Sequence, residues 1–167
     1  MNLYLLRHGI AAEPGSLEYR NDSERPLTDE GERKLQHVAE ALEKLEITFD
    51  VILSSPFVRA WQTASIVAES LEISKKLRRC EPLIPGGSLK QLIQELNALK
   101  PAPNDVLLVG HEPSLSHHIS FLISGHADAA VTMKKGALCK LSADSLRYGR
   151  CATLEWLLTA KLMGAMG

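Results

Sequence analysis

The chain has 167 residues, a length that suits one domain with a substantial core, and its 45% apolar and 23% charged residues are ordinary for a globular protein. Its formal net charge of −1, without a long run of one sign, argues against nucleic-acid binding through a basic face. No apolar run approaches the roughly 18 residues of a membrane span and the first residues lack the layout of a signal peptide, so we expect a cytoplasmic protein with no membrane contact.

Strand-like and helix-like segments alternate through the first hundred residues. The helix-like segments carry apolar residues at the spacing of one helix face, and two of them begin at a capping side chain, Thr28 or Ser88. The strand-like segments are short apolar runs bounded by turn residues. In chain order, the pattern predicts a strand at 2–6, a helix at 28–46, a strand at 49–55, a helix at 57–71, a short strand at 76–83 and a helix at 88–99.

The second part of the chain continues this alternation and then changes it. After a loop at 100–105, the unbroken apolar run 106–110 predicts a strand covered on both faces, and a helix follows at about 114–124. Strand-like runs close the chain at 129–134, 136–142 and 152–160. This order predicts an α/β fold, a three-layer α/β/α sandwich with a mostly parallel central sheet and an antiparallel edge strand, built as one domain over 1–167. The sequence does not decide whether the end, 159–167, is ordered, although its Ala and Gly content is compatible with fraying.

Basic side chains follow the three clearest strands. Arg7, His8 and Gly9 follow the first strand, Arg59 lies in the first turn after the second, and His111 follows the run 106–110. Because the carboxyl ends of parallel strands share one edge of a sheet, we expect these side chains to converge there. The helices that follow also direct their N-termini, with free N–H groups, at that edge.

Two Arg and two His at one sheet edge favour a phosphoryl group. Guanidinium forks match phosphate oxygens, and an unprotonated imidazole nitrogen can attack phosphorus. Gly9 is interpreted as letting the backbone pass close to the ligand. Phosphoryl transfer needs mostly positioning and charge neutralisation, and no acidic pair has the pattern of a metal cage, so we expect no metal and no cofactor. Inorganic phosphate or sulfate is expected to occupy the site.

Three motifs carry a resemblance to a known family. In order, "LRHG", "SSPFVRAWQTA" and "VGHEP" resemble the histidine phosphatase superfamily, also called phosphoglycerate mutase-like, and the resemblance covers nearly the whole chain. The short length, "RPLTDEG" and "KKGALCKL" resemble most the SixA group, the protein phosphohistidine phosphatases. The resemblance implies a phosphoglycerate mutase-like fold.

The resemblance also implies roles for individual residues. His8 matches the nucleophile, which becomes a transient phosphohistidine, and Arg7 and Arg59 match the phosphate clamp. His111 matches the second histidine, which binds the phosphoryl group and stabilises the transition state. Ser55 is expected to orient the pocket.

One departure concerns the acid that protonates the leaving oxygen in larger family members. The candidate here is Glu81, which does not align clearly with that acid. The resemblance to SixA-like members implies that the acid is missing. A phosphoramidate needs less acid assistance than an alkyl ester, because its leaving imidazole is stable, and such assistance contributes about 10²–10⁴-fold. The polar loop 13–26 is expected to border the site, with Arg25 as a possible substrate contact.

Three functions therefore stand as hypotheses. The first is a metal-independent phosphatase that hydrolyses phosphohistidine on a signalling protein, namely a histidine-containing phosphotransfer domain, through phospho-His8. The second is a broad phosphomonoesterase for small metabolites, with Glu81 as its acid. The third is a phosphate-binding module without turnover, which the intact set of Arg7, His8, Arg59 and His111 argues against.

Other polar residues have structural interpretations. Adjacent His117 and His118 face different ways on a helix, so packing is favoured over metal binding. Glu112 is interpreted as stabilising a helix start, and the pair Lys134–Lys135 as flanking a turn, with partner contact as the alternative. Cysteines are odd in number and far apart, which argues against disulfides and structural zinc; they are Cys80, Cys139 and Cys151.

Overall fold

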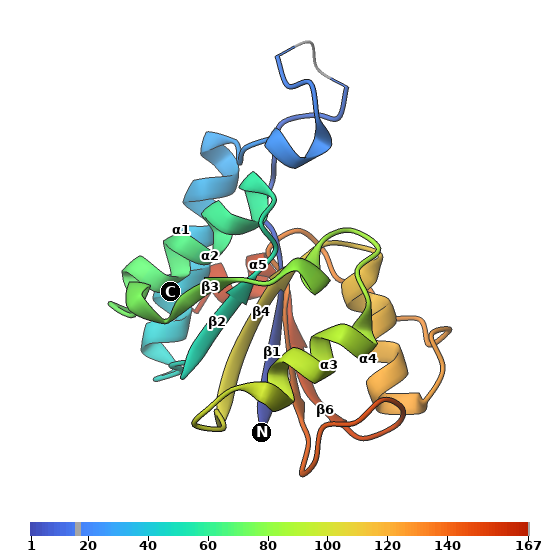
Figure 1. Cartoon of the computed structure of the whole chain (residues 1–167). Helices are drawn as coiled ribbons and strands as arrows, with labels where there is room; N and C mark the ends of the chain where they lie inside the picture. The colour runs from blue at the N-terminus through green and yellow to red at the C-terminus, as the bar shows by residue number, and fades with distance from the viewer. Residues whose placement is uncertain (16–17, 167) are drawn as a thin grey trace.

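The computed structural model describes residues 1–15 and 18–166, and its strands form one sheet in the order β3-β2-β4-β1-β5-β6 (Figure 1). Strands β1 to β4 run parallel, β5 pairs antiparallel with β1, and β6 pairs antiparallel with β5. The strands are β1 (Asn2–Arg7), β2 (Val51–Ser54), β3 (Leu77–Arg79), β4 (Asp105–Gly110), β5 (Leu138–Ser142) and β6 (Thr153–Leu158). The predicted mostly parallel sheet with an antiparallel edge is confirmed.

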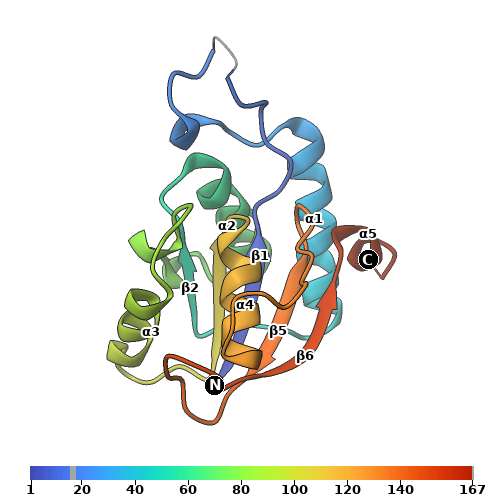
Figure 2. The same ribbon diagram turned by 90° about the vertical axis from the view of Figure 1, so that its right-hand side faces the viewer.

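Helices cover both faces of this sheet (Figures 1 and 2). One apolar cluster joins α1, α2 and α5 to one face, and a second joins α3 and α4 to the other. The helices are α1 (Asp29–Lys44), α2 (Val58–Ser70), α3 (Leu89–Ala98), α4 (Ser114–Ser124) and α5 (Ala160–Gly164), with short 3₁₀ turns η1 (Asp22–Glu24), η2 (Ser74–Lys76) and η3 (Glu81–Leu83). The three-layer α/β/α prediction is therefore confirmed.

The strand sequences explain why two helical layers are needed. Along β1, Leu3 and Leu5 belong to one apolar cluster, while Tyr4 and Leu6 belong to the other. Successive side chains of a strand point to opposite faces, so an all-apolar strand has to be covered twice. Capping fixes the helix starts as predicted: the Thr28 Oγ1 accepts a hydrogen bond from the Gly31 N–H at 3.1 Å at the start of α1.

Two of the predicted strands are wrong or too long. Residues 129–134 form no strand, because the antiparallel ladder with β1 begins only at Leu138 and the Met133 carbonyl instead accepts a hydrogen bond from Arg7. The predicted strand 76–83 is limited to Leu77–Arg79, since Pro82 has no N–H for a ladder and the chain turns into η3.

The end of the chain is also more ordered than its composition indicates. Composition left the order of 159–167 open, and the structure forms helix α5 there, where Thr159 Oγ1 accepts from the Leu162 N–H and Met163 is completely buried in the apolar cluster that includes α1. Burial of one large apolar side chain outweighs the weak helix preference of the glycine there. Gly167 lies outside the described residues.

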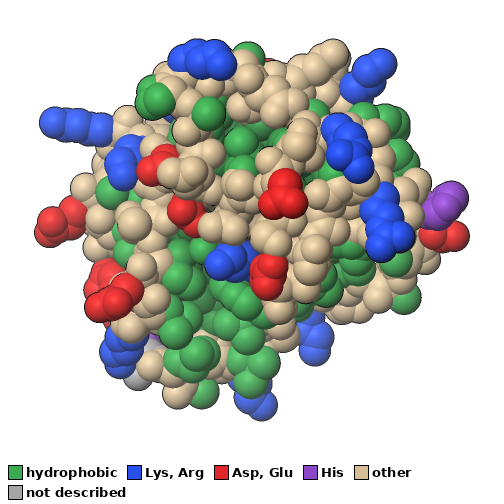
Figure 3. Space-filling view, turned by 90° about the horizontal axis from the view of Figure 1, so that it is seen from below, with side chains coloured by type: hydrophobic (Ala, Val, Ile, Leu, Met, Phe, Trp, Pro, Cys, Tyr) green, Lys and Arg blue, Asp and Glu red, His purple; other side chains and the backbone are tan. Residues whose placement is uncertain are grey.

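Charged side chains of both signs are scattered over the face that bears the amino ends of the parallel strands (Figure 3). Within the described ranges, none of the helices is both long and apolar enough to cross a membrane.

His118 is a buried ionisable group far from the strand ends. Its side chain is 6% exposed on α4, whereas His117 is exposed, which agrees with the packing interpretation. Burial lowers the pKa of His118 to about 4, although its hydrogen bond with the Gly87 backbone acts in the opposite direction. The folded protein therefore holds this imidazole neutral at a pH where the unfolded chain protonates it.

This difference predicts a loss of stability in acid. Between pH 6.5 and 4 the unfolded state binds more protons at His118, so the free energy of unfolding should fall as pH falls. For His118→Gln, we expect the free energy of unfolding to change less steeply with pH than for the wild type, by up to about 1.4 kcal/mol per pH unit. Urea unfolding at pH 7, 5.5 and 4.5 measures it, with the exposed His117→Gln as control. Equal slopes for the wild type and His118→Gln would contradict the prediction.

Candidate active site

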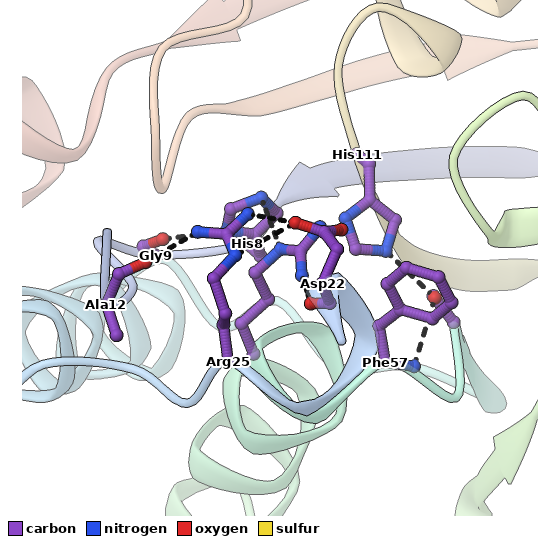
Figure 4. Close-up of polar contacts among 9 residues, drawn as sticks. His8, Gly9, Ala12, Asp22, Arg25, Phe57 and His111 are labelled. Atoms are coloured by element: carbon purple, nitrogen blue, oxygen red, sulfur yellow. Dashed lines mark hydrogen bonds and ion pairs between the residues drawn. The ribbon is translucent and has the colours of Figure 1, made fainter. Parts of the chain in front are cut away.

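The register of the sheet brings the predicted side chains together. Arg7 at the end of β1 pairs with Gly110 at the end of β4. The residues that follow these two strands, His8 and His111, therefore lie side by side at the edge of the sheet. Their ring centroids lie 5.1 Å apart. Arg59, in the first turn of α2, reaches His8 from the neighbouring strand end (Figure 4). The predicted convergence of these residues is therefore observed.

His8 is held in one tautomer. Its Nδ1 lies 2.8 Å from the Gly9 carbonyl oxygen, which can only accept, so we assign the ring hydrogen to Nδ1 and the lone pair to Nε2. Arg59 Nε donates to that Nε2 at 3.3 Å. Burial above all, together with the charges of Arg59, Arg7 and Lys135, lowers the pKa of His8 to about 4, although the Gly9 hydrogen bond acts in the opposite direction. At neutral pH, His8 is thus uncharged, and its Nε2 carries a lone pair that accepts the Arg59 hydrogen bond.

His111 is oriented by Ser55 and Phe57. Its Nε2 lies 2.8 Å from Ser55 Oγ, which accepts a hydrogen bond from the Phe57 N–H. We assign the Ser55 hydroxyl as the donor to Nε2, because it then donates one hydrogen bond and accepts another from Phe57. In this assignment the ring hydrogen of His111 is on Nδ1. Burial and the neighbouring His8 and Arg59 lower the pKa of His111 to about 3. The predicted orienting position of Ser55 therefore has a contact to support it.

Two buried nitrogens at this point lack a partner among the described residues. They are His111 Nδ1 and Arg7 Nε. Another Arg7 nitrogen, Nη1, donates to the Met133 carbonyl at 2.8 Å, which fixes the guanidinium. A buried donor without an acceptor costs about 1–3 kcal/mol, so these two nitrogens are available to an acceptor that arrives from outside, such as an oxyanion.

Asp22 is a site residue that the sequence analysis missed. It lies in η1, which stands above the carboxyl ends of the strands (Figure 1), and its carboxylate contacts Arg59 Nη2 at 2.8 Å and Arg25 Nη2 at 2.6 Å (Figure 4). Partial burial raises the pKa of Asp22, but the hydrogen bonds and charges of Arg25 and Arg59 outweigh this and lower it. An ionised carboxylate therefore sits on the clamp. The acidic residue three positions before Arg25 was the available signal.

Removal of this carboxylate should strengthen anion binding. A phosphoryl group has to displace Asp22 from its arginines, so we expect Asp22→Asn to bind tungstate about five- to tenfold more tightly than the wild type. Isothermal titration calorimetry measures this, with Glu24→Gln in the same turn as the matched control. Weaker tungstate binding by Asp22→Asn would show that Asp22 positions Arg59 and does not compete with the anion.

The other predicted residues have varied surroundings. Arg25 donates hydrogen bonds to the Asp22 carboxylate and to the Ala12 carbonyl. Because Asp22 also contacts Arg59, this part of the loop 13–26 borders the site as expected. Residues 16 and 17 of the loop lie outside the described residues. A Cβ at Gly9 would lie 2.7 Å from Leu35 Cδ1, so the missing side chain makes room for α1, and the close approach of Gly9 to a ligand stays a prediction.

Two glutamates near the motifs stay away from His8. Glu81 is exposed in η3 and, within the described part of the chain, forms no hydrogen bond with the clustered Arg and His side chains; its role as an acid stays a prediction. Glu112 accepts a hydrogen bond from the Ser116 N–H at 2.9 Å at the start of α4, as its structural interpretation predicts.

Comparisons with known proteins agree with this geometry. The family model of the histidine phosphatase superfamily (branch 1) matches residues 3–81. An uncharacterised protein of Picosynechococcus sp. is 36% identical over 148 residues, 88% of each chain. Phosphohistidine phosphatase SixA of Escherichia coli K12 is 28% identical over 160 residues, 95% of this chain and 94% of that protein.

A solved structure extends the agreement to three dimensions. The structure of the protein histidine phosphatase SixA complexed with tungstate matches with a TM-score of 0.83 and 26% identity, over 96% of this chain and 98% of that chain. The resemblance indicated by the three motifs is thus confirmed in both sequence and fold. The chain belongs to the histidine phosphatase superfamily and is by class a phosphatase hydrolase.

Proposed function

We propose that this chain, acting as one histidine phosphatase domain over 1–167 in the cytoplasm, hydrolyses phosphohistidine on a signalling protein. The substrate that we propose is a histidine-containing phosphotransfer domain. The observation that carries the proposal is the state of His8: a neutral imidazole whose Nε2 lone pair lies among buried donors that lack an acceptor in the described structure. The SixA name of two similar proteins supports the choice of phosphohistidine.

The first step transfers the phosphoryl group to His8. Its oxygens bind Arg7, Arg59 and His111 Nδ1, and Nε2 of His8 forms a bond to phosphorus. The substrate N–P bond breaks and its electron pair returns to the leaving imidazole nitrogen, while the other nitrogen of that ring carries a proton taken from solvent, so that the ring leaves as neutral imidazole. The Gly9 carbonyl stabilises the positive charge that develops on the His8 ring through the Nδ1 hydrogen bond.

The second step regenerates the enzyme. A water oxygen attacks phosphorus, and the electrons of the Nε2–P bond return to His8. One proton of the water stays on the product phosphate and the other passes to solvent. Both steps rely on positioning and charge neutralisation by side chains of this chain, so the proposal includes no metal and no cofactor.

The local carboxylates favour a phosphoramidate over an alkyl ester. An alkoxide leaving group needs a proton, yet Glu81 is exposed and bonds to none of the clustered residues in the described ranges. Asp22 does reach the clamp in the free protein, but there its arginine partners lower its pKa, so the carboxylate enters the reaction without a proton to donate. A leaving imidazole takes its proton from solvent on the other ring nitrogen, so it needs no carboxylic acid placed at the scissile bond. The metabolite phosphomonoesterase is accordingly the second candidate.

The test compares two substrates with EDTA present. Phosphate release is measured from a phosphohistidyl phosphotransfer protein and from p-nitrophenyl phosphate. Fast release from the protein alone is the expected result. Preference for the aryl ester would move the assignment to a metabolite phosphatase, and bound phosphate without release from either substrate would identify a non-catalytic binding module.

A further inference from the structure

A cavity of about 730 Å³ opens beside the candidate active site. It lies between α1, α5 and the turn that precedes β5, next to the end of β1. The residues that line it are Arg7, Ile10, Lys34, His37, Lys134, Lys135, Thr159, Ala160, Lys161 and Gly164. Nothing in the proposed reaction uses this space, so its lining needs an explanation of its own.

The lining carries charge of one sign. Five of its residues are Lys or Arg and none is Asp or Glu, although the chain as a whole has 19 basic and 20 acidic residues. Lys34 is paired with Glu30 on α1. In the part of the chain that the structure describes, Lys134, Lys135 and Lys161 form no ion pair. The cavity therefore concentrates positive charge that the protein itself leaves uncompensated.

The cavity adjoins the clustered Arg and His side chains through Arg7. Arg7 belongs to both, and the Gly136 N–H contacts the carbonyl oxygens of Arg7 at 3.1 Å and of His8 at 3.2 Å, which holds the Lys134–Lys135 turn against the His8 backbone. The charge of Lys135 is felt at the His8 imidazole. A substrate whose phosphoryl group lies on His8 therefore places its neighbouring groups within reach of these lysines.

We propose that this cavity is a specificity subsite that binds acidic side chains flanking the phosphohistidine of a protein substrate. The inference rests on the proposed function and names its substrate class: an acidic segment. Several ammonium groups from two segments match several carboxylates, and the apolar surfaces of Ile10 and Ala160 between them suit the methylene stems of Glu and Asp. A polypeptide carrying two or three acidic residues supplies both.

Two synthetic peptides of equal length test the proposal. Each carries one phosphohistidine, flanked by glutamates in the first peptide and by glutamines in the second, and kcat/KM is measured for both. We expect the wild type to prefer the Glu peptide about tenfold at low salt, and the preference to shrink at high salt. The Lys134→Glu/Lys161→Glu double variant should reverse it. Lys90→Glu, on α3 across the sheet, is the matched control and should keep the wild-type preference.

The outcomes separate this inference from the proposed function. Hydrolysis of both peptides with equal kcat/KM would overturn the subsite and leave the phosphatase standing. If neither peptide is hydrolysed, the proposed function fails, and the subsite is then judged by fluorescence anisotropy with the unphosphorylated Glu peptide, which should bind the wild type and not the double variant. Citrate competing as strongly as the Glu peptide would overturn the assignment to a protein segment in favour of a small polyanion.

Discussion

His8→Ala is expected to lower kcat/KM for a phosphohistidine substrate by at least about 10³-fold. The variant loses the only nitrogen whose lone pair is assigned to the site at neutral pH among the described residues, and no neighbouring group can replace it. Ser55 is engaged by His111 and Phe57, and His111 has its Nε2 turned away toward Ser55. The residual rate should be that of a bound phosphoryl group attacked directly by water.

The same prediction can be tested at the level of the intermediate. With a ³²P-labelled substrate and an alkaline quench, the wild type should carry label on His8, and His8→Ala should carry none. His126→Ala, an exposed loop histidine, is the matched control and should behave as the wild type. Tungstate binding by His8→Ala shows that the variant is folded with an intact clamp. Label on another residue of the wild type would contradict the assignment of the nucleophile.

The sheet edge could be predicted because local pattern and topology agree there. The apolar runs 2–6 and 106–110 identify two strands that must be covered on both faces, and parallel pairing alone then places His8 and His111 side by side. The tautomer of His8 could not be predicted in this way. It depends on a hydrogen bond to its own neighbour, the Gly9 carbonyl, whose direction is set only when α1 packs beside it.

Tertiary contacts explain where the sequence reading failed. Residues 129–134 have strand-like composition, but the edge of β1 is already paired by β5, and the Met133 carbonyl accepts from Arg7 instead. The segment 160–164 has weak helix preference and is fixed by burial of Met163. Asp22 could not be predicted because a negative carboxylate is not expected at a site for a negative phosphoryl group. Its place in the site follows only from its ion pairs with Arg59 and Arg25, which the fold brings into contact.

Arg59 connects the His8 imidazole with the turn that carries Asp22. Its Nε donates to His8 Nε2, while Nη1 and Nη2 bind the carbonyl and the carboxylate of Asp22. In the proposed reaction these contacts are exchanged when a phosphoryl group enters, because its oxygens and the His8–phosphorus bond need the same Arg59 and His8 atoms. We therefore propose that the guanidinium holds His8 in the free protein and clamps the substrate afterwards.

Arg59→Met is accordingly expected to lower kcat/KM by about 10²–10³-fold, the scale of losing one charged donor to a transition state, with the exposed Arg33→Met on α1 as control. Arg59→Lys should recover only part of the loss, because an ammonium keeps the charge but not the fork.

A second readout separates this role from packing. Since the charge of Arg59 lowers the pKa of His8, its removal should raise the pKa of His8 from about 4 toward its ordinary value, and ¹⁵N NMR titration of the imidazole measures that change. An unchanged His8 titration in Arg59→Met would mean that the Arg59–His8 contact has no electrostatic consequence, and a normal rate would remove Arg59 from the clamp.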